Sequence, residues 1–202
     1  PHHPFDPPRE YAQMYDPDTL EPPVWREGEL EDKPPHFRKA RSGHGFSNEK
    51  YDYSSLSAHD WGTVKSAYYG MITLIDDNIG RILDAIERKG IEDDTLIIFT
   101  NDHGELLGDH GLLFKGPFHY DCLIKAPMIL KWPGEIPKAS RYSQITEHVD
   151  IMPTILEYAG VRTPYGVQGN SMAAILRGDK GAGKMYAMTE FNCYDWGLSV
   201  KT

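Results

Sequence analysis

Residues 95–116 read TLIIFTNDHGELLGDHGLLFKG, and this stretch decides the fold. Its first five residues form a continuous β-branched and aromatic run, which is typical of a strand buried on both faces of a parallel sheet. Asp102 and His103 follow this run, at the carboxyl end of the predicted strand, where open α/β sheets place their sites. Gly104 allows the backbone to leave the strand, so these two neighbouring side chains can converge on one point.

The chemistry of this loop predicts a site for an oxyanion. A carboxylate and an imidazole supply part of a coordination shell for a divalent cation. Lys115 follows Asp102 by thirteen residues, in a loop with four glycines. Because an ammonium near a cation is unfavourable unless an anion lies between them, the combination points to a phosphate or sulfate group. The alternative is an ordinary turn, in which Asp102 is a cap and His103 and Lys115 are solvated.

The segment before the strand predicts one long helix. Between residues 61 and 86, apolar residues recur at spacings of three and four, which indicates an amphipathic helix that begins near Ser57. Gly90 is a suitable C-terminal cap. At about 1.5 Å per residue such a helix is roughly 45 Å long, unless Gly70 or Gly80 breaks it.

The segment after the loop contains further strands and helices. PMILKW, which starts at Pro127, is a second buried strand, and a short helix is expected between Asp150, as its N-cap, and Gly160. Another helix is expected from Asn170, and KMYAMTEF and GLSVKT are two more possible strands. This order predicts an α/β sandwich with a mainly parallel central sheet flanked by helices.

The chain divides into three expected regions. Residues 1–50 hold many prolines and little periodicity, which indicates a loop segment, with a solvated acidic stretch at residues 27–33. Residues 51–180 are the expected α/β core, and residues 181–202 the start of a strand-containing subdomain. Since residue 1 opens a proline-rich stretch without a start methionine, we expect the chain to begin within a longer protein.

Composition excludes some classes of function. A net charge of −9 with scattered basic residues argues against a nucleic-acid partner. No apolar run approaches the roughly 20 residues that span a bilayer. Cys122 and Cys193 lack any metal-binding or CxxC spacing and are expected to be free thiols, so they do not indicate a compartment.

Several linked motifs resemble one family. Residues 68–116, then APMILKWPG, VDIMPTILEYAGV and QGNSM, are similar in order to the C-terminal part of the catalytic domain of sulfatases, in the alkaline-phosphatase-like superfamily. The resemblance implies that Asp102 and His103 bind a divalent cation, usually calcium, with magnesium or manganese as alternatives. It implies a periplasmic or secreted protein but does not fix the compartment.

The resemblance also assigns catalytic roles. Lys115 matches the lysine that contacts the sulfate and the leaving oxygen. PHHP matches an H-x-P motif, so His2 is the histidine that contacts sulfate or protonates the leaving group, and His3 is the weaker candidate. Asp109 and His110 either support the site from behind or form a turn with exposed polar groups; the sequence leaves both open.

The nucleophile of the family is missing from this chain. Sulfatases use a formylglycine made from Cys or Ser in a C/S-x-P-x-R motif, and neither Cys122 nor Cys193 nor any serine begins one. We therefore expect a fragment that is inactive alone, whose partner is the missing N-terminal half of the same protein. The expected activity of the parent is hydrolysis of a small-molecule or glycan sulfate ester. The alternatives are a phosphonate monoester or phosphodiester hydrolase, or a non-catalytic homologue.

Overall fold

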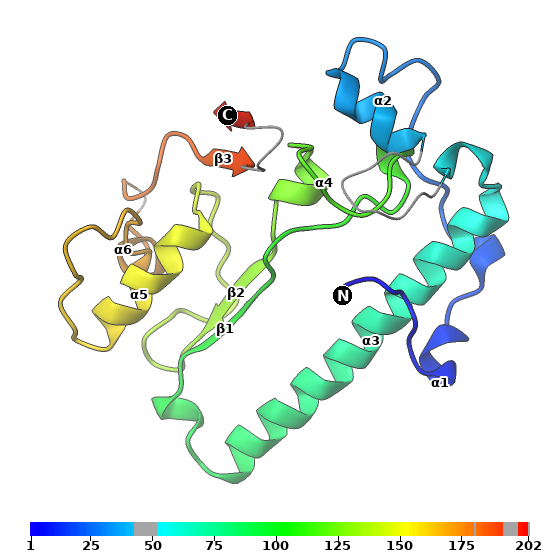
Figure 1. The fold of residues 1–202 in the computed structure, drawn as a ribbon. Helices are drawn as coiled ribbons and strands as arrows, with labels where there is room; N and C mark the ends of the chain where they lie inside the picture. Colours follow the sequence, from blue (N-terminus) through cyan, green and yellow to red (C-terminus); the bar gives the residue numbers. More distant parts are fainter. Residues whose placement is uncertain (43–51, 180, 192–197, 202) are drawn as a thin grey trace. The chain divides into compact units, whose positions relative to one another are not determined.

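The chain folds into two compact units, which are described separately (Figure 1). The residues that the computed structural model describes are 1–42, 52–179, 181–191 and 198–201. Unit 1 consists of Pro1–Arg88 and His103–Lys125, and unit 2 of Lys89–Asp102 and Ala126–Thr202.

The elements of each unit follow the chain in this order. Unit 1 has α1 (Arg9–Ala12), η1 (Pro17–Thr19), α2 (Pro35–Arg41), η2 (Tyr53–Ser55), α3 (Ala58–Arg88), η4 (Asp109–Gly111) and α4 (Asp121–Ile124), where η denotes a 3-10 turn. Unit 2 has η3 (Glu92–Asp94), β1 (Ile97–Thr100), β2 (Met128–Lys131), η5 (His148–Asp150), α5 (Ile151–Tyr158), α6 (Ala173–Leu176), β3 (Met188–Phe191) and β4 (Leu198–Lys201).

The long helix α3 confirms the prediction from apolar spacing. It continues through Gly70 and Gly80 without a break and ends at Arg88. Gly90 then adopts φ +63°, the left-handed conformation of a C-terminal cap.

The first half of α3 packs through small residues. A Cβ atom on Gly62 would lie 2.1 Å from the Pro17 carbonyl oxygen, and one on Gly70 would lie 2.5 Å from the Tyr11 carbonyl oxygen. Between them, the Ser66 hydroxyl donates to the Tyr15 carbonyl over 2.7 Å. These three positions recur every four residues, so one face of the helix lets the N-terminal segment approach its backbone.

The proline-rich segment is less irregular than expected. It contains α1, η1 and α2, of which α2 has a proline at its first position, where the missing N–H costs no helical hydrogen bond. The prediction of a loop was therefore wrong for these short helices. Prolines lie at the starts of α1 and α2: Pro8 is the N-cap residue of α1, and Pro34 and Pro35 are the N-cap and first residues of α2.

The core of unit 1 joins α2 to the loop after His103. Leu106, Leu112, Phe118 and Leu123 are at most 4% exposed, and they pack in one cluster with residues of the segment 30–40. The loop is thus fixed by burial although it contains little regular secondary structure.

The strands of unit 2 form short antiparallel pairs. In the pair β1–β2, Ile97 faces Lys131 and Thr100 faces Met128. The second pair, β3–β4, is also antiparallel. The sequence predicted these strands within a few residues, but the expected parallel order does not occur among the described strands. A continuous apolar run indicates burial on both faces and leaves the strand direction open.

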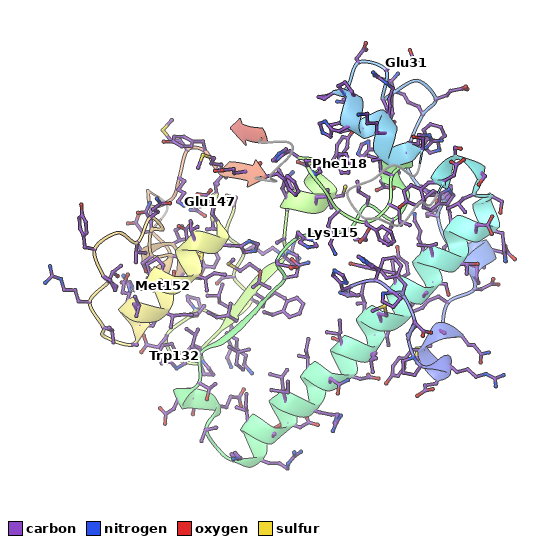
Figure 2. The ribbon with its side chains drawn as sticks, viewed as in Figure 1. Glu31, Lys115, Phe118, Trp132, Glu147 and Met152 are labelled. Carbon is purple, nitrogen blue, oxygen red and sulfur yellow. The ribbon has the colours of Figure 1, made fainter. Side chains whose placement is uncertain are left out.

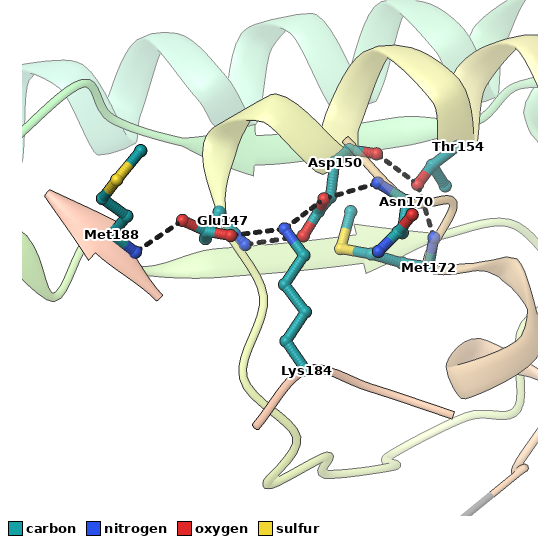
Figure 3. A network of polar contacts seen from close by, with 7 residues as sticks. All are labelled: Glu147, Asp150, Thr154, Asn170, Met172, Lys184 and Met188. Atoms are coloured by element: carbon teal, nitrogen blue, oxygen red, sulfur yellow. Dashed lines mark hydrogen bonds and ion pairs between the residues drawn. The ribbon is translucent and has the colours of Figure 1, made fainter. Parts of the chain in front are cut away.

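Asp150 is at the expected N-cap position of α5, but its side chain binds elsewhere. Its side chain makes no capping bond to α5. Instead, Asp150 Oδ2 accepts from the Glu147 amide (2.9 Å) and Oδ1 accepts from the Asn170 amide (2.8 Å) and from Lys184 Nζ (2.7 Å). Lys184 also pairs with Glu147, so one ammonium links two carboxylates (Figure 3).

Two further findings concern the chain as described. None of the helices in the described ranges combines the length and the apolar character that crossing a bilayer requires. Cys122 is a free thiol, and Cys193 lies outside the described residues.

Candidate functional site

The loop that follows His103 is anchored at its base by a close backbone contact. The Gly104 amide donates to the Leu123 carbonyl over 2.8 Å. A Cβ atom on Gly104 would lie 1.8 Å from the Cys122 carbonyl oxygen, so a glycine is required at this position. The glycine of the Asp-His-Gly sequence therefore has two roles: it lets the chain leave the strand, and it lets the two ends of the loop approach each other.

His103 has the hydrogen-bond arrangement of a metal ligand. Its Nδ1 lies 2.8 Å from the Gly104 carbonyl oxygen, and because a carbonyl only accepts, Nδ1 is the donor. This bond places a proton on Nδ1 and orients the ring, so Nε2 is the nitrogen that would bind a cation. Asp102, which precedes it, is an exposed carboxylate.

The described residues supply only part of a cation shell. No group of three His, Cys, Asp or Glu side chains within the described ranges is arranged to hold a metal. Asp102 and His103 would supply one oxygen and one nitrogen ligand, whereas a hard cation such as calcium takes six or more ligands. The donor types fit such a cation, and further ligands are needed to complete the shell.

Lys115 is half-buried on the returning leg of the loop (Figure 2). Its neighbour Phe114 adopts φ +65°, which is uncommon for a residue with a side chain, and its carbonyl accepts from the Leu106 amide over 3.1 Å. A left-handed residue that is also hydrogen-bonded fixes the direction in which the chain enters the next residue. The backbone at Lys115 is therefore well determined.

The N-terminal histidines lie close to the lysine loop. The ring of His3 is half-buried, and its centroid is 4.6 Å from that of Phe114. The exposed ring of His2 is 4.2 Å from that of His3, and its Nδ1 lies 2.7 Å from the His3 carbonyl oxygen. Unit 1 thus brings the H-x-P motif to the residue that precedes Lys115, although the two are more than a hundred residues apart.

Glu105 is a residue of this loop that sequence analysis missed. Its Oε1 accepts from the Leu106 amide over 3.0 Å. Burial raises the pKa of the Glu105 carboxyl, while the backbone amides and the Lys115 ammonium oppose the rise. A carboxyl group therefore lies within electrostatic range of the lysine, a relation that their spacing of ten residues does not reveal.

Asp109 and His110 lie in the 3-10 turn η4, but they are half-buried and not exposed as the second alternative assumed. Asp109 Oδ1 accepts from the Val24 amide over 2.8 Å, and the His110 amide donates to the Val24 carbonyl over 2.9 Å. His110 Nδ1 lies 2.7 Å from Glu29 Oε1. The pair therefore binds the proline-rich segment to the loop. Glu29 was wrongly assigned to a solvated acidic stretch, because charge density alone does not show that a partner lies elsewhere in the chain.

Helix α2 supports the same loop from further along the proline-rich segment. His36 is buried, with Nε2 3.3 Å from the Pro117 carbonyl oxygen, and Phe37 meets Phe118 edge to face at 4.8 Å. Arg41 donates to the Gly111 carbonyl over 2.9 Å. The loop is thus held on both sides of Lys115.

Cys122 has the properties of a packing residue. Burial raises the pKa of its thiol to about 11, and the nearby Asp109 carboxylate adds to the rise. A thiol of that pKa carries very little thiolate near neutral pH, and the thiolate is the reactive form. This agrees with the absence of the C/S-x-P-x-R motif around it.

Comparison with known proteins gives the same family from several directions. The sulfatase family model matches residues 1–161. The chain is 34% identical over 180 residues to an arylsulfatase of Clostridium perfringens, covering 87% of this chain and 35% of that protein. It is 33% identical over 183 residues to the multifunctional alkaline phosphatase superfamily protein PehA of Trinickia caryophylli, with the same coverage of both chains.

A solved structure extends the likeness to the fold. The phosphonate monoester hydrolase SpPMH of Silicibacter pomeroyi superposes with a TM-score of 0.82 at 32% identity, over 94% of this chain and 38% of that one. The chain thus spans little more than a third of the proteins it matches. Its fold is α/β and alkaline-phosphatase-like, as the sequence predicted, and sulfatases in general use a divalent cation and a formylglycine. The chain belongs to the sulfatase family of hydrolases.

Proposed function

We propose that the protein containing this chain hydrolyses sulfate esters, with Lys115 and His2 contacting the ester and Asp102 and His103 binding a divalent cation. The observation that carries the proposal is that the loop containing Lys115 is fixed in place in a chain of this family. The loop is closed at Gly104, its leucines are buried, and it packs on the H-x-P segment. The formylglycine nucleophile would come from a part of the protein beyond these 202 residues. The substrate class is a small molecule or glycan that carries a sulfate ester.

The side chains of this chain would share the handling of negative charge. The Lys115 ammonium would donate to a sulfate oxygen and stabilise charge on the leaving oxygen, most effectively in a site that excludes water. His2 would supply a proton to that oxygen as the ester bond breaks. A cation bound by Asp102 and His103 would supply Lewis-acid polarisation of the sulfate.

The direct test is the kinetics of Lys115→Ala in the protein that contains this chain, with 4-nitrophenyl sulfate as substrate. We expect kcat/KM to fall by about a hundredfold or more, the effect typical of removing a key charge stabiliser. Lys125→Ala is the matched control, because Lys125 is an exposed lysine of the same unit, paired only with Asp121 among the described residues. A fall below about tenfold for Lys115→Ala would contradict its role.

The cation has a test that does not depend on turnover. Calcium added to the metal-free protein should raise its melting temperature, because a ligand that binds only the folded state stabilises it. Asp102→Ala should reduce this shift strongly, whereas Asp94→Ala, which removes another exposed carboxylate of unit 2, should leave it unchanged. Equal shifts in both variants would exclude Asp102 as a ligand.

Hydrolysis of phosphonate monoesters or phosphodiesters is a second candidate. The observation that favours it is the TM-score of 0.82 with a phosphonate monoester hydrolase. Both reactions place a tetrahedral oxyanion against a cation and a lysine, so the loop described above suits either. Comparing kcat/KM for 4-nitrophenyl sulfate and 4-nitrophenyl phenylphosphonate in one preparation would decide between them. Absence of turnover with both esters would favour a non-catalytic homologue.

A further inference from the structure

The loop that carries Lys115 has a tight turn at its tip. The amides of Leu106 and Gly108 donate to the carbonyls of Phe114 and Leu112 over 3.1 and 2.8 Å, so the two legs of the turn face each other. His110 is at the tip and adopts φ +57°. Such a conformation is unfavourable for a residue with a side chain, and it persists where surrounding contacts hold it.

Three contacts hold His110 in this conformation. Its amide donates to the Val24 carbonyl, its Nδ1 lies 2.7 Å from Glu29 Oε1, and its ring stacks on Tyr120 with centroids 3.6 Å apart and planes 5° apart. Because an ionised carboxylate only accepts, the ring nitrogen is the donor to Glu29. The Glu29 side chain is 13% exposed and that of His110 31%, so the bond is partly shielded from water.

The pKa of the Glu29 carboxyl is consistent with a hydrogen bond donated by the His110 ring. Burial alone would raise the pKa of the Glu29 carboxyl, but hydrogen bonds from the Arg26 amide and the His110 ring outweigh it and lower the pKa. Burial, followed by the charge of Glu29, raises the pKa of Tyr120 to about 12. Tyr120 is therefore a neutral ring near neutral pH, and it covers the imidazole while Glu29 binds its edge.

The contacts at the tip reach Lys115 along one leg of the turn. Four residues separate His110 from Lys115, and the last of them, Phe114, is bonded to Leu106 in the opposite leg and packs on His3. The leg is thus fixed at both ends, at His110 and at Phe114. If the tip were released, the leg that leads to Lys115 would lose its support at His110, and the position of the ammonium would be less well defined.

We propose that His110 and Glu29 are positioning residues for Lys115: through the turn between them they hold its ammonium at the place where charge develops during ester hydrolysis. This inference rests on the proposed function and adds two residues to it. Because a misplacement of about 1 Å can cost about a hundredfold in rate, loss of the contact between His110 and Glu29 should measurably lower the rate of hydrolysis.

The test is a double-mutant cycle in the protein that contains this chain. His110→Ala and Lys115→Ala are made singly and together, and kcat and KM are measured with 4-nitrophenyl sulfate. We expect His110→Ala to lower kcat by about tenfold to a hundredfold with a smaller change in KM. In the Lys115→Ala background, His110→Ala should cost little more, because residues that act as a unit are not additive.

Two conservative variants separate positioning from folding. His110→Asn keeps a side-chain donor and a residue that tolerates the left-handed conformation, so it should recover part of the lost kcat. Glu29→Gln should lower kcat, whereas Glu31→Gln, the matched control on an exposed side chain two residues later, should not. His110→Asn and Glu29→Gln therefore allow the inference to be tested even if His110→Ala fails to fold.

Each outcome discriminates. The inference is overturned if His110→Ala, or Glu29→Gln, lowers kcat by the same factor in the presence of Lys115 and in the Lys115→Ala background. It is also overturned if neither His110→Ala nor Glu29→Gln changes kcat while Lys115→Ala abolishes turnover. Full activity of Lys115→Ala is a different result. It would refute the catalytic role of the lysine and remove the basis of the inference with it.

Discussion

A polar network of unit 2 and one of unit 1 differ in how far they are enclosed. In unit 2, the Asp150 side chain is 3% exposed and accepts three hydrogen bonds. In unit 1, the bond between Glu29 and His110 joins side chains that are 13% and 31% exposed. The enclosed network joins backbone segments around a helix start, whereas the partly open one holds the tip of a loop. We expect the first to govern stability and the second to govern the position of a functional side chain.

The largest effect on stability is expected at Asp150. Asp150→Ala leaves the Lys184 ammonium and two amides without their common acceptor, and losing one partner of a buried ion pair costs about 3–5 kcal/mol. Urea unfolding of the variant would measure this loss. Asp94→Ala, at an exposed carboxylate of the same unit, should stay within about 0.5 kcal/mol. A loss below about 1 kcal/mol at Asp150 would break the contrast between the networks.

The matching change in unit 1 should cost less. Glu29→Ala removes one charge-assisted hydrogen bond from a partly exposed pair, for which about 1–3 kcal/mol is expected. Hydrogen exchange should also show faster exchange at the amides of Gly108, Gly111 and Leu112, which close the turn. If Glu29→Ala destabilises the protein as much as Asp150→Ala, the difference in enclosure has no energetic meaning.

The stability that the network of unit 2 provides should depend on pH through Glu147. The hydrogen bond from Lys184 lowers the pKa of Glu147. A lowered pKa contributes stability that is present above the unfolded value of about 4.3 and is lost as pH falls through the folded value. The urea midpoint should therefore fall on acidification, and Glu147→Gln should flatten this fall. An unchanged slope in the variant would show that other carboxyl groups dominate.

The same network should weaken at high pH. Burial opposes the charged form of Lys184, but its bonds to Asp150 and Glu147 outweigh burial and raise its pKa. Its contribution is thus complete below the unfolded value of about 10.4 and is lost as pH rises through the folded value.

The smallest expected effect is a gain from a residue outside both networks. None of the described residues has an atom within 4 Å of a Cβ atom added to Gly80, which is inside α3. Gly80→Ala should therefore stabilise the protein by about 0.5–1 kcal/mol, since alanine loses less backbone entropy on folding. Thermal unfolding would measure the gain. A decrease in stability would mean that this face of the helix contacts other residues.

Local patterns in the sequence predicted most of the elements. The apolar spacing of α3, the runs of β1 and β2 and the Asp-to-Gly bounds of α5 depend on residues within one element, and the structure confirms them. The antiparallel order was missed because strand direction depends on connections along the chain. The short helices of the first fifty residues were missed because their prolines indicate loop.

The candidate site was predictable only in part, for a related reason. Asp102, His103 and Lys115 lie within one motif, so a resemblance could assign them roles, and these roles stay predictions. The bond of His110 to Glu29 spans 81 residues of sequence, and no periodicity connects its two ends. The positive φ of His110, which Gly111 follows, marks the position as constrained, but it is visible only in the structure.

The small residues of α3 have a consequence for sequence variation. Gly62, Ser66 and Gly70 have no apolar side chains, yet the N-terminal segment rests against the helix backbone at these positions. Saturation mutagenesis should therefore rank substitutions along this face by volume and not by hydrophobicity. Leucine, a favourable residue for helices in general, should be among the least tolerated there, because its side chain would overlap the backbone that faces the helix.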